Sequence, residues 1–280
     1  MNWSQIAAMP WMLWRRQVAA ILRLELKKSL FSKRAWWIYV LTLGPVVVTA
    51  LHSLFSRFGE HTLAEDTMVF AGIFQVYFLR LGIFFGCVGI FSNLFRGEVL
   101  ERTMHYYFLA PVRREVLAVS KYLAGLVAAV VFFVGSVALS FICISMHWGP
   151  VFQQYLFHGP GMAQLLSYML TAALACAGYG AVFLLIGVMF RNPMIPAVTV
   201  WVWENLNSFL PSLLKKFSVI FYLKSLSPVD VAPDGPLAIL ATVTDPTPAW
   251  LAIPGLLAVS AVVLAYAAVR ARGLEVSYSE

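Results

Sequence analysis

Long continuous runs of apolar residues, separated by short polar segments, dominate the pattern along this chain. Six such runs occur, and each is about 20 residues or longer, which is the length that an α-helix needs to cross a hydrocarbon layer of ~30 Å. Apolar positions within the runs are continuous and do not alternate with polar ones, which favours spanning helices over a membrane β-barrel. We expect spans at residues 36–55, 68–94, 122–146, 164–190, 194–214 and 250–269.

The segment before the first span has an amphipathic pattern. At 100° per residue, residues 11–34 place basic side chains on one face of a helix and apolar side chains on the opposite face. Such a helix suits the cytoplasmic surface of a membrane, with its basic face toward anionic headgroups. A loosely ordered basic arm is the alternative. The basic residues expected at the membrane surface are Arg16, Arg23, Lys27 and Arg34.

Composition and charge agree with an integral membrane protein. Apolar residues make up 61% of the chain and charged residues only 12%, whereas about 25% are charged in soluble domains. Fifteen of the twenty lysines and arginines fall on one side of the expected spans, so both termini are predicted to be cytoplasmic. This bias explains the net charge of +7 without a nucleic-acid partner. We expect a multi-pass protein of the cell membrane, without a cleavable signal peptide because the first apolar run is too long.

Two charged residues interrupt the apolar runs. Arg80 lies near the middle of the second expected span, and Glu204 lies within the fifth, beside Asn205 and Asn207. Because an isolated charge inside a membrane costs at least ~2.5 kcal/mol, we expect partners for both. The hypothesis is an Arg80–Glu204 pair, or a polar patch around it, in a transport pathway or a subunit interface. A static bridge that locks the helix bundle is the alternative.

The cytoplasmic segment 95–112, between the second and third spans, is unusually rich in charge. Glu98, Glu101, Arg102 and His105 recur at offsets of three and four residues, which predicts a short helix. Pro111 ends that helix, since proline disfavours the helical conformation of the residue before it. A metal site on these acids and the histidine is one alternative, although it would need a second, facing set of ligands. A solvated loop is another.

Residues 97–121 are similar to the cytoplasmic segment of type 2 ATP-binding-cassette (ABC) transporter permeases. That family's pattern is Gly-Glu, a Thr five residues after the Glu, a hydrophobic stretch, Pro-Val-x-Arg, and a Lys that opens the third span. The chain departs from the usual pattern at Arg102, where many members have Gly, and at His105, where many have an acid or a neutral residue. These departures bear on which ATPase is accepted. The matching residues are Gly97, Glu98, Thr103, Pro111, Val112, Arg114 and Lys121.

The resemblance implies that the charged segment is a coupling helix, seated in a cleft of a cytoplasmic ATPase subunit. ATP-driven closure of two such ATPases would displace this helix and drive alternating access, with export of a hydrophobic or amphiphilic substrate. The chain has no G-x-x-x-x-G-K-[ST] phosphate loop, so ATP and Mg would bind to the partner ATPase. A second permease subunit, identical or different, would complete the pathway. The residues implied in ATPase coupling are Gly97, Glu98, Glu101, Arg102, Thr103, His105 and Tyr106.

Two other classes of function stay open. One is a membrane scaffold or sensor that binds a cytoplasmic partner without transport. The other is an intramembrane enzyme, which would need catalytic groups that converge at one depth. The five histidines are scattered along the sequence, no H-E-x-x-H motif occurs, and the three cysteines, which lie inside spans, are expected to serve in packing. The exterior segment 215–249 is broken by prolines and should form only short helical pieces.

Overall fold

The computed structural model describes residues 11–31, 36–56, 62–100, 109, 113–229 and 247–273, and within them every regular element is a helix. Five stretches among these residues are long and apolar enough to cross a membrane. The prediction of an all-α membrane protein is therefore confirmed at this level, with five spanning candidates. These five are Trp36–Phe55, Leu63–Val99, Arg114–Trp148, Gly161–Met189 and Ala249–Arg272.

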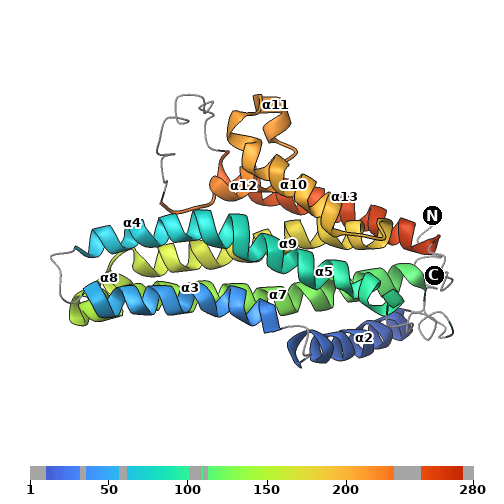
Figure 1. The fold of residues 1–280 in the computed structure, drawn as a ribbon, viewed down its shortest axis with the longest axis horizontal. Helices are drawn as coiled ribbons and strands as arrows, with labels where there is room; N and C mark the ends of the chain where they lie inside the picture. Colours follow the sequence, from blue (N-terminus) through green and yellow to red (C-terminus); the bar gives the residue numbers. More distant parts are fainter. Residues whose placement is uncertain are drawn as a thin grey trace.

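The helices form an elongated bundle (Figure 1). Helices α3, α5, α7 and α9 run along its long axis, α2 lies at one end, and α8 lies at the other. The second span is not uniform, since a π-helical stretch, η3, separates α4 from α5. The elements are α2 (Trp11–Phe31), α3 (Trp36–Phe55), α4 (Leu63–Ile73), η3 (Phe74–Gly82), α5 (Ile83–Leu100), α7 (Arg114–Ser145), η4 (Met146–Trp148), α8 (Pro150–His158), α9 (Gly161–Met189), α10 (Met194–Leu206), η5 (Asn207–Phe209), α11 (Ser212–Lys215), α12 (Val219–Lys224) and α13 (Ala249–Arg272).

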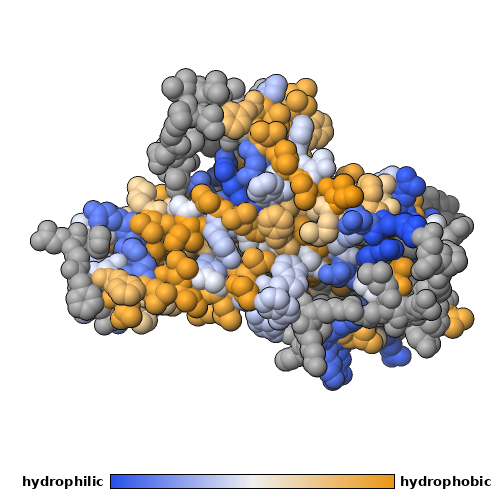
Figure 2. Space-filling view, in the orientation of Figure 1, coloured by the Kyte–Doolittle hydropathy of each residue, from blue (hydrophilic) through white to orange (hydrophobic). Residues whose placement is uncertain are grey.

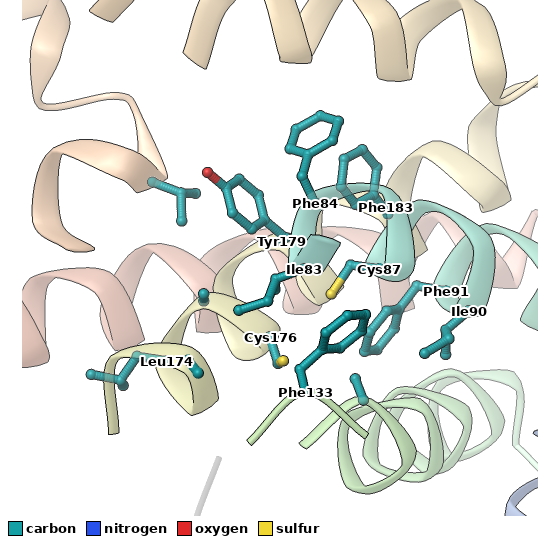
Figure 3. Close-up of a cluster of buried hydrophobic side chains, with 14 of the residues drawn as sticks. Ile83, Phe84, Cys87, Ile90, Phe91, Phe133, Leu174, Cys176, Tyr179 and Phe183 are labelled. Carbon is teal, nitrogen blue, oxygen red and sulfur yellow. The ribbon is translucent and has the colours of Figure 1, made fainter. Parts of the chain in front are cut away.

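Helix α9 is the centre of the bundle, and it packs against α5, α7 and α13. Glycine makes the closest approach possible: a Cβ at Gly187 would lie 2.8 Å from the backbone oxygen of Ser92 on α5. Aromatic rings fill the interface nearby, with the ring centroids of Phe84 and Phe183 4.9 Å apart. Figure 3 shows this cluster. The tight α5–α9 contact therefore forms the rigid core of the molecule.

The cysteines take part in this packing. Cys87 of α5 and Cys176 of α9 are both buried, and both lie in the cluster of Figure 3. Cys143 is partly buried, and all three are free thiols. The described residues also contain no group of three or more His, Cys, Asp or Glu side chains arranged to hold a metal ion.

The outer surface of the bundle is apolar along most of its length. In Figure 2 hydrophobic atoms cover much of the middle of the visible face, and hydrophilic atoms gather toward both ends. Helices α3 and α13 contribute large exposed apolar side chains, such as Val47 and Val262. This distribution is the one expected for a protein whose sides face lipid tails and whose ends face water.

The expected fifth span, residues 194–214, is not a single helix. Helix α10 has 13 residues and ends at Leu206, so at 1.5 Å per residue it is about 20 Å long and shorter than a hydrocarbon layer. A 3-10 turn follows, and then Pro211 precedes the four-residue helix α11. The apolar run alone predicted a continuous span wrongly, because its polar residues and its proline break the helix. Helix α12 then packs against α9 and α13.

Several expected residues lie outside the part of the chain that the structure describes. They include Arg34 of the amphipathic segment and most of the coupling segment: Glu101, Arg102, Thr103, His105 and Tyr106. Of the segment 215–249, which is expected to be exterior, the structure describes residues 215–229 and 247–249, and the first part contains the short helix α12. The roles assigned to the undescribed residues stay predictions.

Candidate coupling site

Three helices meet where the two ends of the coupling segment leave the bundle. Helix α5 ends at Leu100 and α7 begins at Arg114; α7 packs against α2, and α5 packs against α7. Each helix contributes one charged residue to a buried cluster: Glu25 from α2, Glu98 from α5 and Lys121 from α7. None of the three is more than 2% exposed. We call these three residues the buried triad.

Short ion pairs hold the buried triad together. The Nζ atom of Lys121 lies 2.5 Å from Oε1 of Glu25 and 2.8 Å from Oε1 of Glu98. A fourth residue, Lys28 of α2, lies at the edge of the cluster with its Nζ atom 3.9 Å from Oε1 of Glu98 and its side chain 41% exposed. The described part of the cluster therefore holds two acids and two lysines. Burial of ions is costly unless they are paired in good geometry, and here each has an opposite charge beside it.

The buried triad ties both ends of the coupling segment to one helix. Glu98 lies two residues before the end of α5, and Lys121 is the eighth residue of α7. Because both bind to each other and Lys121 also binds Glu25, these contacts connect α5 and α7 to α2. The ring of Phe95 adds a cation–π contact, with its centroid 5.6 Å from Nζ of Lys121.

Further contacts connect the start of α7 to its neighbours. The guanidinium of Arg113 lies 5.2 Å from the centre of the Trp14 ring on α2. Arg114 donates a hydrogen bond of 2.6 Å to the backbone oxygen of Arg272 at the end of α13. Arg272 in turn pairs with Glu115, with 2.6 Å between Nε and Oε1. The first turn of α7 is therefore linked to both α2 and α13.

The sequence pattern named Gly97, Glu98 and Lys121, and the structure brings Glu98 and Lys121, but not Gly97, into the triad. The Glu98 side chain points inward to Lys121 rather than to solvent. Gly97 has no close neighbour, since an added Cβ would meet nothing nearer than the Cβ of Asn93 at 3.8 Å. Sequence reasoning missed Glu25 altogether. One feature of the sequence could have revealed Glu25: it is the only acid in the basic segment 11–34.

Polar residues of the fifth expected span bind to neighbouring elements of the bundle. Glu204 is buried and accepts four hydrogen bonds: from the hydroxyls of Tyr179 at 3.2 Å and Ser218 at 2.8 Å, and from the backbone N–H groups of Val219 at 3.0 Å and Ile220 at 2.8 Å. The carboxylate therefore caps the start of α12 and holds it against α9 and α10.

The two asparagines near Glu204 make local hydrogen bonds. Asn207 donates to the backbone oxygen of Lys215 at 3.2 Å, and Asn205 donates to the backbone oxygen of Trp201, one turn earlier, at 2.8 Å. Asn207 thus closes the turn between α10 and α11. The hydrogen bond of Asn205 lies within its own helix, α10.

The expected ion pair between Arg80 and Glu204 is absent from the described residues, because the Glu204 carboxylate is occupied by the four donors at α12. The two regions are linked by a side-chain-to-backbone hydrogen bond: the indole N–H of Trp201 donates to the backbone oxygen of Arg80 at 3.2 Å. Helix α10 therefore lies against η3 at the level of Arg80.

A second polar cluster lies at the opposite end of the bundle, and sequence reasoning did not find it. Asp66 of α4 is 1% exposed and accepts a hydrogen bond of 2.8 Å from the indole of Trp148. Two histidines also face it, with His52 Nε2 at 3.0 Å and His147 Nε2 at 3.5 Å from the carboxylate oxygens. These contacts join α3, α4 and η4, so this cluster fastens the ends of three helices.

Comparison with known protein families gives one match. The model of a family described as ABC-2 family transporter protein matches residues 21–204, about two thirds of the chain. The matched region begins within α2 and ends at Glu204, so it includes all three residues of the buried triad. A comparison with curated proteins finds no match.

Proposed function

This chain belongs to the ABC-2 family of transporter proteins, and from that premise we propose that it is the permease subunit of an ABC exporter. Two copies of a separate ATPase subunit bind ATP and Mg, and the permease itself binds no cofactor. A second permease subunit, identical or different, completes the pathway. The cargo is a hydrophobic or amphiphilic molecule, which moves by alternating access. Five apolar helices and the family match support this proposal.

The observation that carries the mechanism is the buried triad. In our proposal, closure of the ATPases on ATP displaces the segment between α5 and α7. Because Glu98 and Lys121 are bound to each other and to Glu25, α2, α5 and α7 move as one unit. The first turn of α7 extends this movement to α13 through Arg114.

The coupling residues fall into two groups: one that positions the segment and one that contacts the ATPase. Glu98 is buried, so in our proposal it holds the coupling segment in position and does not itself contact the ATPase. Direct contact falls to the residues beyond α5, which are Glu101, Arg102, Thr103, His105 and Tyr106. Gly97, the residue before Glu98, leaves one position near the end of α5 without a side chain.

Helix α2 sits on the cytoplasmic surface of the cell membrane in this proposal, and both termini are cytoplasmic. Three of the basic residues expected there, Arg16, Arg23 and Lys27, are exposed. Their charge suits anionic lipid headgroups, each contributing about 1 kcal/mol near the surface. The opposite side of α2 carries Ile21 and Glu25, which are buried against the bundle.

The test is purification of the affinity-tagged chain from its own cells, followed by reconstitution into proteoliposomes. We expect an ABC ATPase to co-purify, and the complex to move a fluorescent lipid-like probe only when ATP is hydrolysed. A complex that binds a cytoplasmic protein but hydrolyses no ATP would instead indicate a scaffold or sensor. Transport without any ATP-consuming subunit would contradict the proposal.

A further inference from the structure

We propose that Arg80 binds the anionic headgroup of the transported amphiphile, midway along the bundle between η3 and α10. This inference rests on the proposed function and names the class of its cargo: an apolar chain that carries a phosphate, sulfate or carboxylate group.

The local backbone around Arg80 is unusual. Arg80 lies near the middle of the spanning stretch Leu63–Val99 and within the nine-residue π-helix η3. Regular α-helix precedes η3 and follows it. π-Helical segments are rare and occur frequently at functional sites, where they change the direction in which side chains point. The π-helix therefore contains Arg80, the one charged residue in the central part of Leu63–Val99.

Arg80 has no acidic partner among the described residues. The nearest candidate from the sequence was Glu204, whose carboxylate is committed to the start of α12. The other acids with described side chains lie toward the ends of the bundle, in the buried triad and at Glu65, Asp66 and Glu115. A guanidinium at membrane depth is unfavourable without an anion. Its planar array of donors matches phosphate and carboxylate oxygens.

A second copy of this chain does not supply the missing anion from its described residues. In that copy, too, Glu204 would be the only described acid at this depth. Its carboxylate is buried and already accepts four hydrogen bonds. The geometry therefore favours a small anionic ligand over a carboxylate of the partner permease.

The surroundings of Arg80 suit the apolar part of an amphiphile. Val76, four residues earlier, and Val202 of α10 are both exposed. The indole of Trp201 lies against the backbone of Arg80 and its ring centroid is 6.2 Å from that of Phe85. These apolar and aromatic side chains lie on η3, on the first turn of α5 and on α10, the elements at the level of Arg80, and they suit the apolar tail of an amphiphile whose anionic head binds Arg80.

Polar groups also lead away from Arg80 along the bundle. Gln75, about one π-helical turn earlier, donates a hydrogen bond of 3.1 Å to the backbone oxygen of Val229, just beyond α12. Figure 2 shows a hydrophilic patch near α12, in the middle of the otherwise largely apolar visible face. A headgroup that leaves Arg80 in this direction therefore stays close to polar atoms.

The test measures binding of two fluorescent probes to the full chain in nanodiscs of phosphatidylcholine. One probe is a single alkyl chain with a phosphate headgroup, and the other has the same chain with a neutral maltoside headgroup. Fluorescence anisotropy gives the two affinities for wild type, Arg80→Gln, Arg80→Lys and the control Lys216→Gln, an exposed lysine of the exterior segment. Size-exclusion profiles check folding and dimerisation of each variant.

We expect the wild type to bind the phosphate probe at least about tenfold more tightly than the neutral one, the effect of one charge-assisted hydrogen bond. Arg80→Gln should abolish that preference and leave the neutral probe unaffected, Arg80→Lys should keep part of it, and Lys216→Gln should change nothing. Equal affinities in the wild type, or an unchanged preference in Arg80→Gln, would overturn the proposal. So would loss of the dimer in Arg80→Gln with both probes weakened equally, since that outcome assigns Arg80 to the subunit interface.

This experiment separates the inference from the proposed function. Stimulation of the ATPase by the permease is measured in the same nanodiscs without any probe. If that stimulation is absent while the phosphate preference depends on Arg80, the transporter proposal fails and the binding site stands. If stimulation is present and the preference for the phosphate probe is absent, the transporter proposal stands and the proposed Arg80 binding site fails.

Discussion

Replacement of Lys121 by methionine removes the buried lysine that lies between two buried carboxylates. In the wild type, Lys121 is 0% exposed, with Glu25 and Glu98 at 2.5 and 2.8 Å. Lys121→Met keeps most of the side-chain volume but leaves two like charges facing each other away from water. Removal of one partner from a buried ion pair costs about 3–5 kcal/mol. We expect a clearly lower midpoint of thermal unfolding, and loss of ATPase stimulation in the reconstituted complex.

Two companion variants make this prediction specific. Lys28→Met removes a half-exposed lysine 3.9 Å from the same Glu98 carboxylate, and should cost no more than about 1 kcal/mol. Combining Lys121→Met with Glu25→Gln and Glu98→Gln removes all three charges, and should recover much of the lost stability, since a neutral cluster avoids the desolvation penalty. If Lys121→Met unfolds at the same temperature as Lys28→Met, the reasoning about the buried triad is refuted.

Three further changes test other parts of the account. Glu204→Gln replaces a carboxylate that accepts four hydrogen bonds by an amide whose NH2 group cannot accept, so we expect a loss of about 1–3 kcal/mol and faster hydrogen exchange in α12; unchanged exchange would contradict the capping role. Gly187→Ala forces a Cβ to within 2.8 Å of the α5 backbone and should cost about 1–3 kcal/mol, whereas Gly135→Ala, where a Cβ meets nothing within 4 Å, should not destabilise. Substitution of both Arg16 and Arg23 by Gln should weaken binding to anionic vesicles by about 2 kcal/mol; no change in a vesicle flotation assay would remove α2 from the membrane surface.

The helices themselves were largely predictable, because their signal is local. A continuous apolar run of sufficient length has few alternatives in a membrane, and five of the six runs correspond to long helices. The run at 194–214 failed for a reason that was visible in the sequence but given too little weight. Its polar residues Glu204 and Asn207 bind to groups ahead in the chain, at Ser218 and Lys215, and such groups bend the chain back rather than continue the helix.

Contacts between distant charges were much harder to predict. Glu25 and Lys121 are 96 positions apart, and nothing in either local pattern identifies the other. Glu98 and Lys121 were both noticed through the family pattern, yet their mutual contact depends on how α5 packs against α7. The Arg80–Glu204 hypothesis matched charges by depth, and depth does not reveal the backbone donors at α12 that bind Glu204.

The central claim is that α2, α5 and α7 move together when the ATPases close. Its most direct test is a distance measurement between spin labels at Leu24 on α2 and Val127 on α7, both exposed, in a Cys143→Ala background. The account predicts the same distance within one subunit in the nucleotide-free and ATP-bound complexes, while the distance between the two Leu24 labels of a permease dimer changes. A Leu24–Val127 distance that shifts on ATP binding would mean that α2 moves independently of α7, and would contradict the account.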